Sequence, residues 1–284
     1  MNRHLPPSAW IGLALIVISQ AGMLARLEPF WSWHTPIAWT GYILLVDGLV
    51  WVRRGDSPLT SGRAEVVFIA IASVALWIIF EQYNKHWLRN WHYEGLPSVL
   101  LVRYVGYAWA FATIWPAMFV TAELVGALRD RRAPEYRRAD PRTIPLGAAG
   151  WISVIAGAAM LLWPIAFPSP WLAAPVWLGF IFLLDPINAR NGAESLRADL
   201  AARHPGRLIN LLTAGLICGI VWEFWNYWAR TRWIYTVPVP PHVKIFEMPV
   251  AGYLGFPVFA VECFTMYVFV RHYLWRGAWR PIAL

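Results

Sequence analysis

Eight long apolar runs constrain this chain more than any other feature of its sequence. Runs such as 10–25 and 211–228 are too long, too apolar and too poor in charge for the core of a soluble domain. A helix needs about 20 residues to cross the roughly 30 Å of hydrocarbon in a bilayer, where the backbone must satisfy its own hydrogen bonds. The runs therefore predict an all-α integral membrane protein. The predicted spans are 8–25, 35–52, 64–83, 99–126, 144–167, 171–186, 207–228 and 250–271.

The composition agrees with a membrane protein and excludes several other classes. Of the 284 residues, 58% are hydrophobic and 14% are charged, whereas soluble domains carry about 25% charged residues. A disordered chain, a nucleic-acid-binding domain and a disulfide-stapled secreted module are therefore excluded. Cys218 and Cys263 both lie inside apolar runs. There we expect two small hydrophobic side chains and not a disulfide or a metal site.

The distribution of basic residues predicts the orientation of the helices. With the N-terminus in the cytoplasm, 17 of the 24 Lys and Arg residues fall in predicted inside segments. The seven predicted outside are Arg26, Lys85, Arg89, Arg103, Arg230, Arg232 and Lys244. This bias follows the positive-inside rule and predicts that both termini are cytoplasmic. The net charge of +8 is then mainly a topogenic signal, so the expected partners are membrane lipids and not nucleic acid.

The chain also contains an internal repeat. Residues 41–47 match residues 179–185 at an offset of 138, each run beginning with Gly and ending with Asp. A second match, at an offset of 142, has the pattern Glu-x-x-Asn-x6-Trp-x-Tyr. Its members are Glu81, Asn84, Trp91 and Tyr93 in the first half, and Glu223, Asn226, Trp233 and Tyr235 in the second. Weaker matches follow in each half: Gly106-Tyr107 with Gly252-Tyr253, Pro116 with Pro257, and Glu123 with Glu262.

The duplication predicts two parallel four-helix repeats. Because each copy has an even number of helices, both copies have the same orientation and are related by an axis along the membrane normal. The first repeat is predicted over 1–126 and the second over 144–284. An arginine-rich cytoplasmic linker over 127–143 joins them.

The repeated glutamates and asparagines are the first candidate site. Each Glu lies one helical turn from its Asn, at the outer end of the third helix of its repeat, and Trp and Tyr follow. Ionisable groups at membrane depth are costly, which favours a functional role. Glu81 and Glu223 are candidate acid–base groups, and the Asn, Trp and Tyr residues of both copies are candidate ligand contacts. The alternatives are polar contacts between helices and interfacial aromatic anchors.

Other acids are weaker candidates. Glu262 lies in the middle of the last predicted helix and is a candidate catalytic acid, and Glu123 is a candidate ligand contact. Pro116 and Pro257 are expected to kink the helices that carry them. Asp47 and Asp185 lie near inner helix ends, where an ion pair or a helix-terminus hydrogen bond is expected.

No metal or cofactor is predicted. His86 and His92 lie near Glu81 and Glu94, but their counterparts Trp228 and Ile234 cannot ligate a metal. This excludes a symmetric metal centre and leaves a single site open. The sequence has no phosphate-binding loop and no serine-hydrolase elbow, so ATP-driven transport and serine hydrolysis have no support.

The segments 222–229, 233–238 and 246–257 carry a resemblance to known families. With their Trp-Glu-Phe-Trp-Asn-Tyr-Trp-Ala, Trp-Ile-Tyr-Thr-Val-Pro and Phe-Glu-Met-Pro-Val-Ala-Gly-Tyr motifs, they resemble duplicated bacterial membrane proteins to which no activity is attached. Phe-Glu-Met-Pro is also similar to segments of membrane-embedded carotenoid enzymes, the heterodimer-type lycopene cyclases and the carotenoid hydratases. The cyclases' paired acids after the proline are replaced here by Val250-Ala251, so no catalytic residue is carried over. The resemblance implies the bacterial inner membrane.

Three functions remain at this point. The first is an outer-leaflet site between the repeats that binds, and by acid–base chemistry converts, a lipid-like or isoprenoid molecule. The second is a pseudo-symmetric transporter or channel for a cation or small amine. The third is a non-catalytic scaffold with a protein partner or a second copy of itself.

Overall fold

The computed structural model describes residues 3–130, 143–238 and 243–283. Within these ranges, eight helical segments are long and apolar enough to cross a membrane, which confirms the predicted helical fold and its eight candidate spans. Their bounds are Pro7–Leu24, Phe30–Arg54, Arg63–Leu88, Leu100–Arg129, Gly147–Ala166, Pro170–Arg190, Gly206–Trp228 and Val250–Leu274. Most of the predicted linker lies outside the described residues.

The first four spans contain six α-helices, a π-helical turn and one strand. These are α1 (Pro7–Leu24), α2 (Phe30–Arg54), α3 (Pro58–Ser61), α4 (Arg63–Tyr83), η1 (Asn84–Leu88), β1 (Trp91–Glu94), α5 (Leu100–Ala112) and α6 (Ile114–Arg129). The remainder contains five α-helices, two 3₁₀ turns and three strands. These are α7 (Gly147–Ala166), η2 (Pro170–Leu172), α8 (Ala173–Arg190), α9 (Leu196–Ala201), α10 (Gly206–Trp228), β2 (Arg232–Tyr235), β3 (Lys244–Ile245), β4 (Met248–Pro249), η3 (Val250–Leu254) and α11 (Gly255–Leu274).

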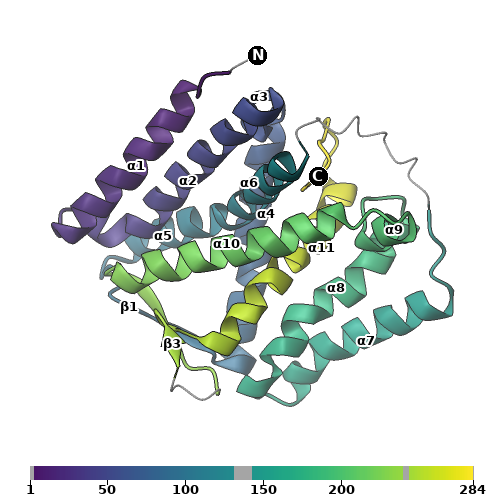
Figure 1. Cartoon of the computed structure of the whole chain (residues 1–284). Coiled ribbons are helices and arrows are strands. Elements are labelled where there is room, and N and C mark those ends of the chain that lie inside the picture. The colour runs from purple at the N-terminus through teal and green to yellow at the C-terminus, as the bar shows by residue number, and fades with distance from the viewer. Residues whose placement is uncertain (1–2, 131–142, 239–242, 284) are drawn as a thin grey trace.

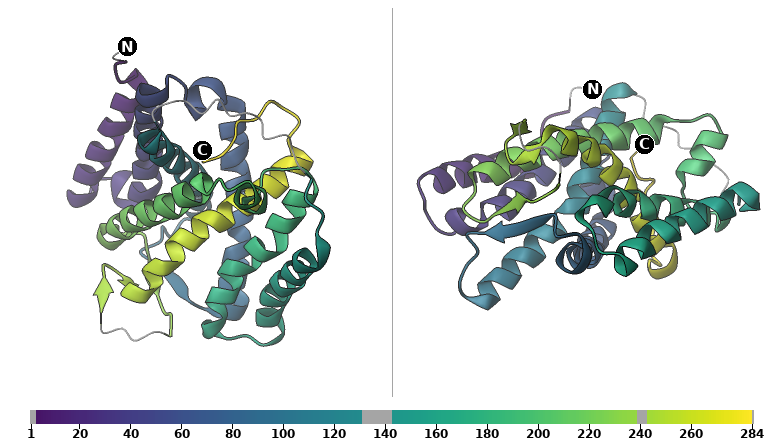
Figure 2. Two further views of the ribbon diagram at one scale, coloured as in Figure 1. Left: turned by 45° about the vertical axis from the view of Figure 1, so that its right-hand side comes forward. Right: turned by 90° about the horizontal axis from the view of Figure 1, so that it is seen from below.

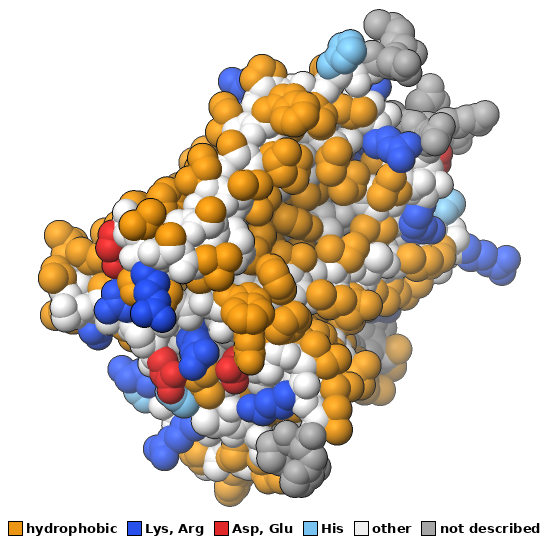
Figure 3. Space-filling view, turned by 60° about the vertical axis from the view of Figure 1, so that its left-hand side comes forward, with side chains coloured by type: hydrophobic (Ala, Val, Ile, Leu, Met, Phe, Trp, Pro, Cys, Tyr) orange, Lys and Arg blue, Asp and Glu red, His pale blue; other side chains and the backbone are white. Residues whose placement is uncertain are grey.

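Two helix hairpins flank a central group of helices. The hairpin α1–α2 lies on one side, α7–α8 lies on the other, and α4, α6, α10 and α11 pack between them (Figure 1; Figure 2). The two chain ends, α3 and α9 lie at one end of the bundle, which we call the terminal end (Figure 1). The strands lie at the opposite end, the strand end. A broad apolar surface separates charged groups at the two ends (Figure 3).

Glycines allow the helices of each hairpin to approach closely. A Cβ atom on Gly12 would lie 2.5 Å from the carbonyl oxygen of Gly41, and one on Gly157 would lie 2.7 Å from that of Gly179. Small residues at such crossings let two helices pack backbone to backbone in a membrane. Gly41 and Gly179, which match in the sequence repeat, therefore both lie at a close contact between two helices.

Prolines mark breaks in the fourth and eighth spans. α5 ends at Ala112 and α6 begins at Ile114, so Pro116 falls in the first turn of α6. Pro257 falls in the first turn of α11, directly after η3. Both positions tolerate proline because first-turn N–H groups have no helical partner. The helix is thus interrupted just before each proline, where the sequence predicted a kink.

Asp47 and Asp185 accept hydrogen bonds from residues at the start of the short helices α3 and α9 at the terminal end. Asp47 accepts hydrogen bonds from the hydroxyl of Ser57 (2.8 Å) and the N–H of Leu59 (2.9 Å). Asp185 accepts from the N–H groups of Leu196 (2.7 Å) and Arg197 (2.9 Å). Of the two expected roles, the helix-terminus hydrogen bond is the one observed.

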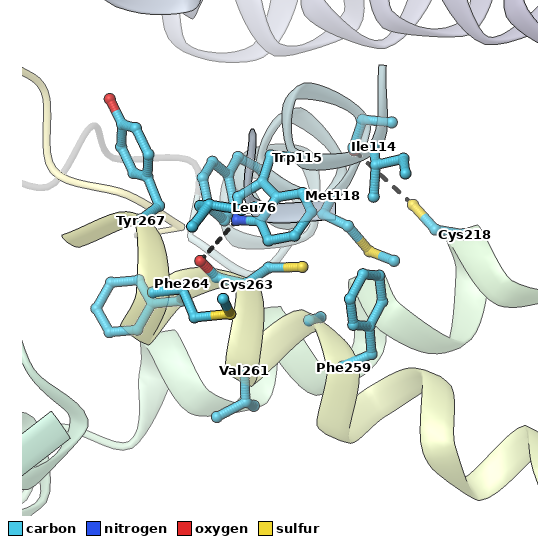
Figure 4. Packing of buried hydrophobic residues seen from close by; sticks show 14 of the residues in the cluster. Leu76, Ile114, Trp115, Met118, Cys218, Phe259, Val261, Cys263, Phe264 and Tyr267 are labelled. Atoms are coloured by element: carbon cyan, nitrogen blue, oxygen red, sulfur yellow. Dashed lines mark hydrogen bonds between the residues drawn. The ribbon is translucent and has the colours of Figure 1, made fainter. Parts of the chain in front are cut away.

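The central core lies between α4, α6, α10 and α11. Trp115 is fully buried there, and its indole N–H donates to the carbonyl oxygen of Cys263 at 2.9 Å (Figure 4). Cys218 and Cys263 are both free and buried, as expected of small hydrophobic side chains.

Candidate functional site

The repeat-matched aromatic residues form a two-stranded ribbon at the strand end. β1 and β2 pair antiparallel, with Trp91 opposite Tyr235 and Tyr93 opposite Trp233. The Trp of one half thus faces the Tyr of the other, and the central pair is His92 with Ile234. This register is the one that a two-fold axis through the central pair would produce. The sequence placed these residues after the ends of two helices but did not predict the strands, because pairing between such distant segments has no local signal.

Asn84 and Asn226 hold the two strands in place. The side-chain oxygen of Asn84 accepts from the N–H of Trp91 at 3.0 Å, and its amide donates to the carbonyl of Trp91 at 2.8 Å. Asn226 makes the same two contacts with Trp233, at 2.9 and 2.8 Å. These contacts fix the turn between η1 and β1 in the first half, and the turn between α10 and β2 in the second half.

Each repeated glutamate accepts a hydrogen bond from the tyrosine of its own strand. The Tyr93 hydroxyl donates to Glu81 at 2.5 Å, and the Tyr235 hydroxyl donates to Glu223 at 2.8 Å. Burial raises the pKa of both tyrosines well above the ordinary value, and the neighbouring carboxylates raise it further. Both phenols are therefore neutral donors.

The two tyrosine–glutamate couples are not equivalent. Glu81 also accepts from the indole N–H of Trp77 at 2.9 Å. Glu223 is fully buried, and its second carboxylate oxygen has no hydrogen-bond partner within the described residues. The Tyr235 oxygen in turn accepts from the indole of Trp233 at 2.8 Å. Glu223 is therefore the less satisfied carboxylate of the two.

A cavity of about 580 Å³ lies beneath the ribbon, between the two halves of the chain. This volume falls within the range of small-molecule sites. Its wall is mainly apolar. Eight of the 20 tryptophans line it: Trp33, Trp39, Trp77, Trp91, Trp171, Trp177, Trp222 and Trp233. Trp222, from the second half of the chain, packs against two tryptophans of the first half. Its ring centroid lies 5.9 Å from that of Trp39 and 5.9 Å from that of Trp77.

The candidate site residues divide into a wall and a layer behind it. Trp91, Tyr93, Trp233 and Tyr235 line the cavity, whereas the repeated Glu and Asn residues do not. Glu262 is fully buried, and neither carboxylate oxygen has a hydrogen-bond partner within the described residues. Glu123 lies away from the cavity and pairs with Arg54 at 2.9 Å. Neither Glu262 nor Glu123 lines the cavity wall.

Sequence analysis missed a buried ionic network at the terminal end. Arg207 pairs with Glu194 at 2.7 Å, Glu194 pairs with Arg271, and Arg271 pairs with Glu65 at 3.2 Å. All four side chains are at most 5% exposed. Glu65 and Arg207 stand at the 142-residue offset with opposite charges, so a search for identical residues could not reveal them.

Histidines and acids form no obvious metal site. In the described ranges, no group of three or more His, Cys, Asp or Glu side chains is placed to hold a metal ion. His92 lies 3.6 Å from Glu94, and both side chains are about half exposed.

Asp199, next to the network, gives a prediction for the pH dependence of stability. Burial raises its pKa from 3.8 to about 6, although the positive charge of Arg207 acts to lower it. A raised pKa stabilises the fold below about pH 4, and this stabilisation is lost as the pH rises through about 6. Between pH 4 and 7, the wild type should lose about 2 kcal/mol more stability than Asp199→Asn. Thermal unfolding in detergent tests this, and equal pH slopes would contradict it.

Fold and site together define a mainly helical protein with eight candidate membrane spans in the described residues and a tryptophan-lined cavity at one end. Comparison with known protein families, curated proteins and solved structures found no match.

Proposed function

We propose that the cavity binds a lipid-like, largely apolar molecule, such as an isoprenoid. The observation that carries the proposal is the wall of eight tryptophans around a space between the two halves. An apolar ligand gains free energy by leaving water, and indole rings offer large rigid contact surfaces. The neutral hydroxyls of Tyr93 and Tyr235 supply polar contacts that would orient it.

We also propose that the chain consists of the two parallel repeats expected from its sequence. Four matched features support this: the hairpin glycines, the aspartates at α3 and α9, the asparagine clamps and the register of β1 with β2. Each places equivalent residues in equivalent roles. The arginine distribution favours cytoplasmic termini. The resemblance to bacterial membrane proteins favours the bacterial inner membrane as the location.

Binding is tested with a conjugated tetraene fatty acid added to the purified protein in nanodiscs. The tryptophans of the wall should transfer excitation energy to the bound polyene, giving a saturable signal that a non-fluorescent isoprenoid alcohol displaces. A signal that only rises in proportion to the polyene in the lipid would contradict the proposal and leave a scaffold role.

The tyrosine–glutamate couples extend the proposal to acid–base conversion of the ligand. A proton leaving a ligand at the Tyr235 oxygen can be passed on, because the hydroxyl already donates to Glu223. The reverse movement would protonate the ligand. Glu223 thus acts through Tyr235 and positions its proton, while the tyrosine touches the ligand.

The conversion is tested by Glu223→Gln. Loss of the proton acceptor should lower turnover of a polyene substrate by about 100-fold or more, while polyene binding changes little. The matched control is Glu94→Gln, on the same ribbon but about half exposed. Equal turnover in both variants would leave binding without chemistry.

Transport is a second candidate, favoured by the closed terminal end. The C-terminal segment seals that end: Ile282 is 5% exposed, Ala283 is fully buried, and Asn210 donates to the carbonyl of Ala283 at 3.0 Å. A cavity at one end and a seal at the other are the arrangement of a one-side-open transporter. Aromatic walls with carboxylates behind them also suit a cationic amine. Uptake of such an amine into protein-containing vesicles would select this function.

A further inference from the structure

Part of the cavity wall is also part of the protein surface. Trp171 lines the cavity and is 67% exposed, and Leu254 lines it and is 76% exposed. Ala174 and Ala251 share both properties. Residues that face both a cavity and the outside lie at its mouth. We call the surface formed by these four residues the portal.

The portal opens between two membrane spans. Trp171 and Ala174 belong to the span that begins at Pro170, and Ala251 and Leu254 belong to the span that begins at Val250. All four side chains are apolar and lie within the first five residues of their spans, at the strand end. If these spans cross a bilayer, this level is the boundary between headgroups and lipid chains. The charged lining residue, Arg103, lies elsewhere, on α5. Apolar chains from the bilayer therefore face a continuous apolar surface that leads inward.

The first half of the chain has the same elements in a closed arrangement. The 138-residue offset relates Trp33 to Trp171, and the repeat relates Gly106 to Gly252. Trp33 packs edge-on against Trp109, with centroids 5.8 Å apart, and its indole nitrogen lies 3.2 Å from where a Cβ of Gly106 would stand. Trp171 makes no ring contact with the aromatic residues that the structure describes. The tryptophan that closes one half is turned outward in the other.

We propose that an apolar chain dissolved in the bilayer enters the cavity sideways through the portal. This inference rests on the proposed function, and it adds the route and therefore the class of ligand: a molecule delivered by the membrane and not by water. Trp171 then lies where the chain passes, and the Trp33 side of the cavity serves as a closed wall.

The test uses a phosphatidylcholine that carries a photoactivatable diazirine on its acyl chain, in vesicles that contain the protein. In the wild type, we expect cross-links at the portal and at Trp222 and Phe259 on the inner wall. Ala174→Trp places an indole in the mouth at an exposed position, where it should not disturb the core. It should abolish the inner cross-links. Ala251→Trp, on the opposite side of the mouth, should do the same.

The matched control is Ala159→Trp, an exposed position on α7 that does not line the cavity. It should keep the inner cross-links. Inner labelling that persists in Ala174→Trp and Ala251→Trp would overturn the portal but not the binding site. Absence of inner labelling in the wild type, together with no saturable polyene signal, would instead overturn the proposed function.

Discussion

Replacing Arg271 with leucine is expected to lower the free energy of unfolding by about 3–5 kcal/mol, because removal of one partner leaves buried charges uncompensated. Arg271 contacts both Glu65 and Glu194, and it also donates to the carbonyl of Arg280 at 3.1 Å. The midpoint of thermal unfolding in detergent should fall by roughly 5–10 °C.

The control for this prediction is Arg276→Leu. Arg276 is exposed just beyond the same helix, so its loss should change stability by less than about 0.5 kcal/mol. Adding Glu65→Gln to the Arg271 variant should restore part of the stability, since Arg271 pairs with Glu65 and its loss strands that buried charge. If Arg271→Leu is no more harmful than Arg276→Leu, the network does not hold the terminal end together.

Replacing Trp222 with alanine should weaken polyene binding by about 30-fold or more, the effect of losing a central aromatic contact worth about 2 kcal/mol. Trp222 packs on Trp39 and Trp77 from one half and on Trp233 from the other, with the last pair of centroids 5.7 Å apart. Its removal opens the middle of the wall. Energy transfer to the tetraene fatty acid measures the change.

Trp228→Ala is the matched control. Trp228 lies on the same helix, is 47% exposed and does not line the cavity. It should bind the polyene with nearly wild-type affinity. Similar affinity in the two variants would mean that the polyene binds outside the cavity, on the lipid-facing surface. Both variants should be titrated well below their unfolding temperatures, because loss of a packed tryptophan also lowers stability.

The two tests separate stability from function. Arg271 lies at the terminal end, whereas Trp222 lies under the ribbon at the strand end. Residues so far apart, with no shared partner, should act additively. In a variant with both changes, the loss of stability should equal the sum of the two single losses of stability. The loss of affinity should likewise equal the sum of the two single losses in binding free energy.

Much of the architecture was predictable from the sequence. The spans follow from hydrophobic runs, because a bilayer accepts only segments that satisfy their own backbone. The observed ends differ from the predicted ones by a few residues in most cases. The largest differences are at the second span, which begins at Phe30, and at the third span, which continues to Leu88. The sixth span continues through Pro186 to Arg190. A proline inside a helix removes only one hydrogen bond, so it need not end the span.

The repeat identified the right residues but not their arrangement. It singled out Glu81, Asn84, Trp91 and Tyr93 with their partners, and the structure brings both sets to one ribbon. Which of them face the cavity could not be read from spacing, since helix and strand directions change between Asn84 and Trp91. The tertiary structure turns the aromatic residues inward and leaves the carboxylates behind them.

The sequence by itself therefore determined the membrane spans and the matched residues of the two halves, because hydrophobicity and repetition are written along the chain. Only the tertiary structure decided the cavity, the antiparallel pairing of β1 with β2, and the ionic network from Glu65 to Arg207. Each of these depends on contacts between segments far apart in sequence. Their free energy comes from packing and burial in three dimensions, for which neither composition nor periodicity carries a local signal.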